Sequence, residues 1–132
     1  MTLVEWRDEF RIGIPGVDHE HEMLIGMING LHGALQGSPS MTALDFLGEL
    51  DAQIAAHFAL EEREMRDRRY PHYAAHKADH DRLVEEIGEI MDACGEGAEL
   101  DESALGSRLA TWFGVHFRTH DVELHRFLHA RA

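Results

Sequence analysis

Cysteine, proline and basic side chains are all scarce in this 132-residue chain. The single cysteine, Cys94, excludes an intrachain disulfide and also the thiolate-rich sites of zinc and iron–sulfur proteins. Twelve Lys and Arg side chains face 25 Asp and Glu side chains, so the net charge is −13. Nucleic acids and anionic lipids are bound through basic surfaces, and we therefore expect neither as a partner.

Long apolar runs are also missing. No stretch approaches the roughly 18 apolar residues that a membrane-spanning helix needs, and the first ten residues carry charges instead of the apolar core of a signal peptide. We expect no membrane insertion and a cytoplasmic location. With 44% hydrophobic residues and only 3 prolines, the composition is that of a folded protein, and the length predicts a single domain over residues 1–132.

Hydrophobic residues recur every three or four positions, which is typical of helices with one buried face. Turn residues separate an N-terminal arm, residues 1–16, from four expected helices over about 17–36, 41–68, 72–93 and 102–129. Ser40 is a candidate N-cap for the second of these helices, and Asp101 or Ser103 for the fourth. Helices of this length with short loops predict an all-α fold, an antiparallel up-down-up-down four-helix bundle with an N-terminal arm.

Histidine is abundant, with 11 residues. Side chains four residues apart share one face of a helix, so a histidine with a ligand-type partner one turn away can present two ligands to the interior. Burying several imidazoles and a carboxylate without partners would cost several kcal/mol each, and apolar neighbours argue against exposure. A metal would compensate them. The candidates are His21 on the first helix, His57 and Glu61 on the second, His76 and His80 on the third, and His116 on the fourth.

The type of metal site follows from the ligands. A nitrogen-rich site with carboxylates suits iron, zinc, manganese or copper. A single zinc ion needs four ligands, and more are available here, so two ions bridged by carboxylates use the surplus. Ferritin-like di-iron proteins carry Glu-x-x-His on two helices. That motif does not occur in this sequence, which separates the chain from that class.

Four motifs in chain order resemble the hemerythrin family, in particular its short bacterial members, and the resemblance spans nearly the whole chain. The motifs are Val17-Asp18-x-x-His21, His57-Phe58-x-x-Glu61, Tyr70-Pro71 followed by His76-x-x-x-His80, and Trp112-x-x-x-His116-Phe117-x-x-x-Asp121. The resemblance implies two iron ions with a bridging oxo or hydroxo group. Its implied ligands are His76, His80 and His116 for one iron, His21 and His57 for the other, and Glu61 and Asp121 as bridges.

The fourth helix leaves one ambiguity. His120 lies four residues beyond His116, the spacing that an α-helix favours for a shared face, whereas Asp121 lies five beyond, about 140° away around the axis. Helix geometry alone therefore favours His120. The family resemblance favours Asp121, and a local widening of the helix would accommodate it.

The resemblance implies reversible binding of dioxygen, the expected partner, for carriage, storage or local supply, and no enzymatic activity. The alternatives are a sensor of oxygen, nitric oxide or redox state, a di-iron enzyme acting on peroxide or nitric oxide, and a metal store. The expected walls of the oxygen pocket, for which ordinary core packing is the alternative, are Leu24, Phe58, Trp112, Phe113 and Phe117.

The other histidines receive no role in the site. We expect His32 to be a buried polar packing residue. We expect His72, His125 and His129 to lie in solvent.

Overall fold

The structure is a computed structural model that describes residues 2–11, 13, 15–38 and 40–130. Over these residues the chain forms helices and no strand, which confirms the expected all-α fold. The fourth rod of the bundle consists of α4, the π-helix η2 and α5 in direct succession. The elements are the 3₁₀-helix η1 (Asp8–Phe10), α1 (Pro15–Gly37), α2 (Ala43–Asp67), α3 (Tyr73–Gly95), α4 (Glu102–His116), η2 (Phe117–Asp121) and α5 (Val122–Ala130).

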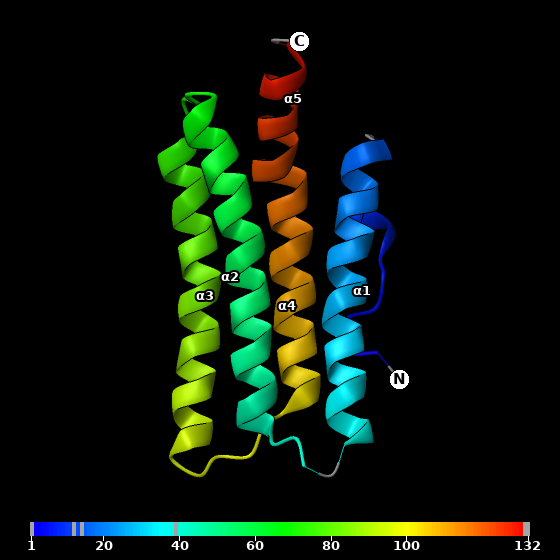
Figure 1. The fold of residues 1–132 in the computed structure, drawn as a ribbon. Coiled ribbons are helices and arrows are strands. Elements are labelled where there is room, and N and C mark those ends of the chain that lie inside the picture. The colour runs from blue at the N-terminus through cyan, green and yellow to red at the C-terminus, as the bar shows by residue number, and fades with distance from the viewer. Residues whose placement is uncertain (1, 12, 14, 39, 131–132) are drawn as a thin grey trace.

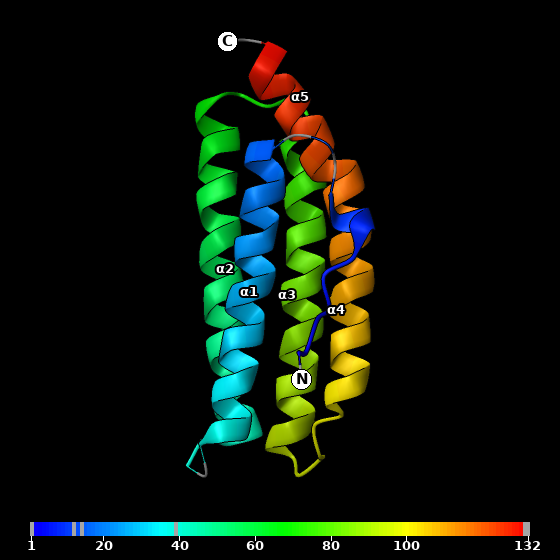
Figure 2. The same ribbon diagram turned by 90° about the vertical axis from the view of Figure 1, so that its right-hand side faces the viewer.

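Successive rods run in opposite directions, and their connections alternate between the two ends of the bundle (Figure 1). The rod made of α4 and α5 extends beyond the other helices at the end where the chain terminates (Figure 1). The N-terminal arm runs along the face that α1 and α4 form (Figure 2). Asn29 of α1 binds the arm there. Its side chain accepts a hydrogen bond from Val4 N at 2.9 Å and donates one to Val4 O at 2.8 Å.

Side-chain caps determine where two of the helices begin. Thr42 accepts a hydrogen bond from Asp45 N at 3.0 Å, and the Asp45 carboxylate accepts one from Thr42 N at 3.2 Å, so α2 starts with a capping box. The sequence suggested Ser40 as the cap of this helix, but the cap is Thr42. Asp101 caps α4 by accepting from Ala104 N at 3.0 Å. Each cap contributes about 1 kcal/mol and fixes the axial position of the side chains that follow.

Two apolar clusters fill the bundle. The larger one joins α1, α2, α3, α4 and the arm, and its fully buried members include Ile28, Leu50, Leu83 and Phe113. The smaller cluster of Met65, Tyr70 and Leu124 lies toward the other end. Along α2, α3 and the fourth rod, the predicted ligands come between residues of the two clusters, so a polar layer is enclosed by apolar packing on both sides.

Within the described ranges, none of the helices combines the length and the apolar composition that crossing a bilayer requires.

Candidate metal centre

Contacts of 3.2 Å or less join six of the seven predicted ligands in the buried polar layer. The six come from all four rods of the bundle, so the site exists only when the whole bundle has formed. They are His21 from α1, Glu61 from α2, His76 and His80 from α3, His116 from α4 and Asp121 from η2.

The two carboxylates occupy central positions among the imidazoles. Asp121 places Oδ2 at 3.1 Å from His21 Nε2, while its Oδ1 lies 3.2 Å from His76 Nε2 and 3.1 Å from His116 Nε2. The Oε1 atom of Glu61 lies 2.7 Å from His76 Nε2 and 3.2 Å from His80 Nε2. Asp121 thus connects the imidazole of α1 with those of α3 and α4.

The π-helix explains how Asp121 reaches the cluster. Hydrogen bonding in a π-helix runs from residue i to i+5, so one turn holds more residues than a turn of α-helix. The segment Phe117–Asp121 has this geometry and brings Asp121 back toward His116, five residues earlier. The expected local widening is therefore present. His120 instead turns toward Asp79, with its Nε2 at 3.8 Å from Asp79 Oδ2 at the edge of the cluster.

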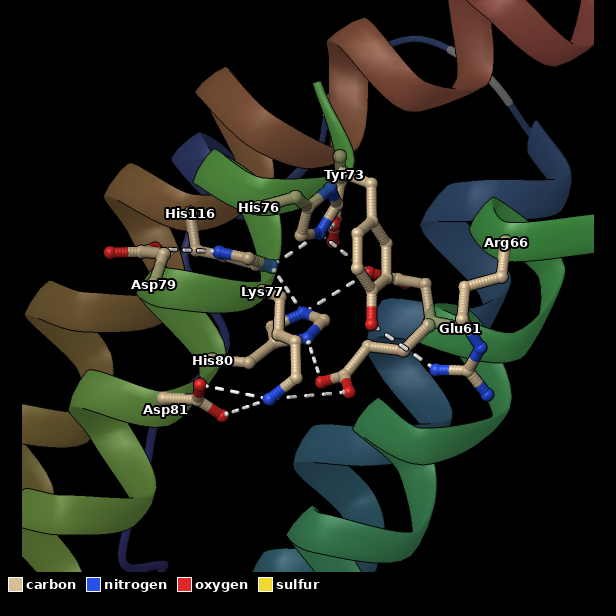
Figure 3. A network of polar contacts seen from close by, with 11 residues as sticks. Glu61, Arg66, Tyr73, His76, Lys77, Asp79, His80, Asp81 and His116 are labelled. Carbon is tan, nitrogen blue, oxygen red and sulfur yellow. Dashed lines mark hydrogen bonds and ion pairs between the residues drawn. The ribbon is translucent and has the colours of Figure 1, made fainter. Parts of the chain in front are cut away.

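Three of the imidazoles have an acceptor for their second nitrogen. His80 Nδ1 donates to Glu62 Oε2 at 2.9 Å and His116 Nδ1 donates to Asp79 Oδ2 at 2.7 Å. His21 Nδ1 lies 3.2 Å from the carbonyl oxygen of Phe10 in the arm. An imidazole that donates from Nδ1 in its neutral form keeps a lone pair on Nε2. Figure 3 shows His80 and His116, whose Nε2 atoms lie 3.2 Å apart.

Several buried atoms at the centre of the cluster have no hydrogen-bond partner in the described part of the chain. They include Glu61 Oε1, His76 Nε2 and Asp121 Oδ1. The two oxygens lie only 2.7 and 3.2 Å from His76 Nε2, close enough for hydrogen bonds but outside their angular range. Leaving such a group unsatisfied costs about 1–3 kcal/mol. A cation bound among these atoms would satisfy all of them.

The ligand atoms of one group also lie at a suitable spacing for a shared ion. One atom each from Glu61, His76, His80 and His116 falls within 4.8 Å of the others. Imidazole nitrogens with a carboxylate oxygen suit iron, and equally other first-row transition metals. The residues present therefore fit a transition-metal site.

Protons compensate the charges of the metal-free cluster. Burial alone would raise the pKa of Asp121, but the neighbouring His116, His21 and His76 outweigh it and hold the pKa well below its usual range. Burial would likewise lower the pKa of His116, but Asp121 and Asp79 outweigh it and raise the pKa to about 9. A metal ion that binds here must displace a proton from His116 at neutral pH.

Aromatic rings hold the imidazoles in place. Phe117 stacks on His21 with ring centroids 3.4 Å apart and planes 7° apart. Phe58 stacks on His80 at 3.9 Å and 1°. Trp112 stacks in the same way on His116, at 4.3 Å and 15°. Together with the hydrogen bonds at Nδ1, this stacking fixes the direction of each Nε2 lone pair.

An open cavity of about 830 Å³ adjoins the cluster between α1, α2 and α5. His57 and Glu61, one turn apart on α2, both line it, as does Leu24. His57 is the predicted ligand that no short contact joins to the other six among the described residues. The remaining expected pocket residues, Phe58, Trp112, Phe113 and Phe117, belong to the aromatic packing around the imidazoles and are not among the residues that line this cavity.

The sequence analysis missed two kinds of residue. Glu62 and Asp79, which orient two of the imidazoles, directly neighbour the predicted ligands Glu61 and His80, so an acidic residue beside a ligand was the available signal. The apolar cavity walls also have a helical signal, since two of their pairs are spaced by four residues. The apolar residues missed are Met23, Met27, Leu60, Leu124 and Leu128.

The expectations for the unassigned histidines hold in part. His32 is buried, and its Nε2 contacts the Glu102 carboxylate. His72 and His129 are exposed, as expected. The expectation for His125 was wrong, because this side chain is half-buried and lines the cavity.

Comparison with known proteins identifies the family to which the chain is similar. The sequence model described as "Hemerythrin HHE cation binding domain" matches residues 13–128. The chain is 31% identical over 122 residues to a bacteriohemerythrin of Pseudomonas aeruginosa, which covers 92% of this chain and 79% of that protein. It is 36% identical over 86 residues to a bacteriohemerythrin of Methylococcus capsulatus, covering 64% of this chain and 65% of the other. A bacteriohemerythrin of Ralstonia nicotianae is 27% identical over 139 residues, covering 100% and 93%.

A helical bundle with a buried layer of imidazoles and carboxylates has the side chains that a cation-binding site requires. The chain belongs to the hemerythrin family.

Proposed function

We propose that this protein binds dioxygen reversibly at a pair of iron ions, for carriage, storage or local supply, and that it acts as a binding protein and not as an enzyme. The observation that carries the proposal is the convergence of six ligand-type side chains in a buried layer, where three ligand atoms lack a hydrogen-bond partner among the described residues. When bound, the two ions supply the electrons and the open coordination position that dioxygen binding requires.

The arrangement of the side chains supports two ions. His76, His80 and His116 form a compact group, and we assign them to one ion. We assign His21 and His57 to the other.

The contacts of the two carboxylates support their proposed role as bridges between the two ions. Asp121 contacts His21 through one oxygen and His76 and His116 through the other. Glu61 contacts two imidazoles of the compact group and lines the cavity beside His57. Each carboxylate therefore lies near residues that we assign to both ions.

The surrounding residues favour binding without further chemistry. The Nδ1 hydrogen bonds of His80 and His116 to Glu62 and Asp79 raise the basicity of these ligands. Two apolar clusters enclose the layer, and the cavity walls are largely Leu and Met side chains. Such walls suit an apolar diatomic molecule.

A sensing role is the second candidate, and one observation favours it. His21 Nδ1 lies 3.2 Å from the Phe10 carbonyl, and Phe117 packs between His21 and Phe10. The arm therefore contacts a proposed ligand directly, so a change in ligation at His21 would alter its contact with the arm.

The test of the proposed function begins with metal analysis of the purified protein, for which we expect about two iron ions per chain. Anaerobic reduction followed by air should produce a coloured form that loses its colour under vacuum and recovers it with air over several cycles. One ion per chain would contradict the di-iron assignment. Immediate and irreversible conversion to the ferric form would contradict reversible binding and favour the sensor.

A further inference from the structure

The cavity beside the candidate metal centre contains one imidazole that is not a proposed ligand. His125 of α5 lines the cavity together with His57 and Glu61. The side chain is half-buried, and within the described ranges neither ring nitrogen has a hydrogen-bond partner. The rest of the wall is mostly apolar, with Met23, Leu24, Met27, Leu60, Leu124 and Leu128. The ring nitrogens of this partly exposed side chain can therefore contact a small molecule that enters the cavity.

The π-helix accounts for the position of this ring. In an uninterrupted α-helix, a residue nine positions beyond His116 would lie about 180° away from it around the axis. The wide turn of η2 accommodates an additional residue, which rotates α5 back by about 100°. His125 follows Asp121 by four residues and therefore shares its face of the helix. The rotation that brings Asp121 to the cluster thus also turns His125 toward the cavity.

We propose that His125 is a positioning residue that donates a hydrogen bond to a small ligand, such as dioxygen or azide, bound in this cavity. The inference rests on the proposed function, because it requires a ligand at the side of the centre where His57 and Glu61 line the cavity. It assigns to the protein a specific polar contact within an otherwise apolar binding space. Such a contact favours ligands that carry negative charge on the atom facing His125.

The charged groups around His125 are consistent with a neutral donor. Burial lowers the pKa of His125, although the carboxylates near it act in the opposite direction. The ring therefore carries one N–H and one lone pair at neutral pH. The titratable groups that face it are Glu20 and His21 from α1, His57, Glu61 and Glu64 from α2, Asp121 from η2, and the exposed His129 on its own helix, with ring centroids 6.3 Å apart.

The first test compares azide binding by three variants of the full iron-loaded chain, followed through the azide-dependent absorption. His125→Leu removes the donor and should weaken azide binding about tenfold. His125→Gln keeps an N–H and should remain within about threefold of the wild type. His129→Leu, at the exposed neighbouring histidine, should not change the affinity. All variants should retain the iron content and helical circular dichroism of the wild type.

The outcomes separate this inference from the proposed function. Equal azide affinity of wild type and His125→Leu would overturn the inference and leave the di-iron site standing. A loss in His125→Gln as large as that in His125→Leu would also overturn it, because the shape of the ring and not its N–H would then matter. A wild type that holds no iron pair, or binds no azide, would overturn the proposed function itself.

A second test needs no variant. Acylation of histidines by diethyl pyrocarbonate, followed by peptide mass spectrometry, reports how accessible each ring nitrogen is. In the iron-loaded protein, azide should slow the acylation of His125 severalfold and leave that of the exposed His72 unchanged. Equal rates for His125 with and without azide would overturn the inference.

Discussion

Asp121 and His116 lie five residues apart in the sequence, and yet Asp121 Oδ1 is 3.1 Å from His116 Nε2. In a regular α-helix these side chains would point about 140° apart. The π-helix between them removes most of that difference and places a carboxylate where it contacts imidazoles from three rods of the bundle. One local irregularity of the backbone therefore completes the candidate site.

The first prediction concerns the choice between two neighbouring ligand-type residues. Asp121→Ala removes the carboxylate that contacts His21, His76 and His116, and it should reduce the iron content from about two ions per chain to one or fewer. His120→Ala changes a side chain at the edge of the cluster and should leave the iron content near that of the wild type. Metal analysis of both purified variants measures the difference. The opposite ranking would refute the assignment of Asp121.

The second prediction tests the π-helix itself. Thr119 is exposed, and its hydroxyl donates to Val115 O at 2.7 Å. Deleting this residue should restore regular α-helical winding and rotate the following residues by about 100°. We expect the deletion variant to lose most of its iron and to melt at a lower temperature, because Leu124 would also leave its buried cluster.

Substitution of Thr119 by Ala is the matched control, since it removes the same hydroxyl without changing the number of residues. This variant should keep the wild-type iron content. Normal iron binding in the deletion variant would show that the widened turn is unnecessary for the site.

The sequence predicted the rods of the bundle more fully than the environment of the site. Periodic apolar residues and strong breakers indicate helices locally, so the expected helix of about 72–93 corresponds to the observed Tyr73–Gly95. The position of His125 could not be obtained in this way, because an α-helical wheel drawn from His116 places it on the opposite face. A π-helix depends on tertiary contacts at Asp121 and has no reliable local signal.

The carboxylates that accept hydrogen bonds from the imidazoles were also not predictable from the sequence. Glu62 follows the predicted ligand Glu61, but this adjacency does not indicate which imidazole Glu62 contacts. Its role arises because α2 and α3 bring it within 2.9 Å of His80 Nδ1. Likewise, Asp79 of α3 contacts His116 of α4, 37 residues away. Such pairs depend on how the helices are packed, which periodicity does not determine.

The third prediction follows from the contact between Asp79 and His116. Asp79→Asn replaces the charged acceptor of His116 Nδ1 by a neutral one, and it should lower metal affinity about 10- to 100-fold. Asp81→Asn, two residues away, alters an exposed carboxylate that pairs with Lys77 at 2.9 Å. This control should bind metal as the wild type does. Competition with a metal chelator provides the measurement, and equal affinities would show that Asp79 does not orient the ligand.

The fourth prediction concerns the pH dependence of the metal-free protein. Folding raises the pKa of His116 from its ordinary 6.5 to about 9, chiefly because Asp121 and Asp79 outweigh the effect of burial. A group whose pKa is raised by folding stabilises the folded state fully at pH values below its pKa in the unfolded state. This stabilisation is lost as the pH rises through its pKa in the folded state. The free energy of unfolding should therefore fall by roughly 1–3 kcal/mol between pH 6.5 and 10.

Urea denaturation of the metal-free protein at several pH values measures this change, with His116→Gln as the comparison that lacks the titrating ring. The contribution of Asp121 to stability depends on pH in the opposite direction. The pKa of Asp121 is lowered, so its contribution is present above about 3.8 and disappears as the pH falls below that value. Metal binding replaces the proton on His116, so adding iron near pH 7 should release protons, and acid should expel the metal. A metal-free wild type and a His116→Gln variant with the same pH dependence would contradict this account of how the buried charges are balanced.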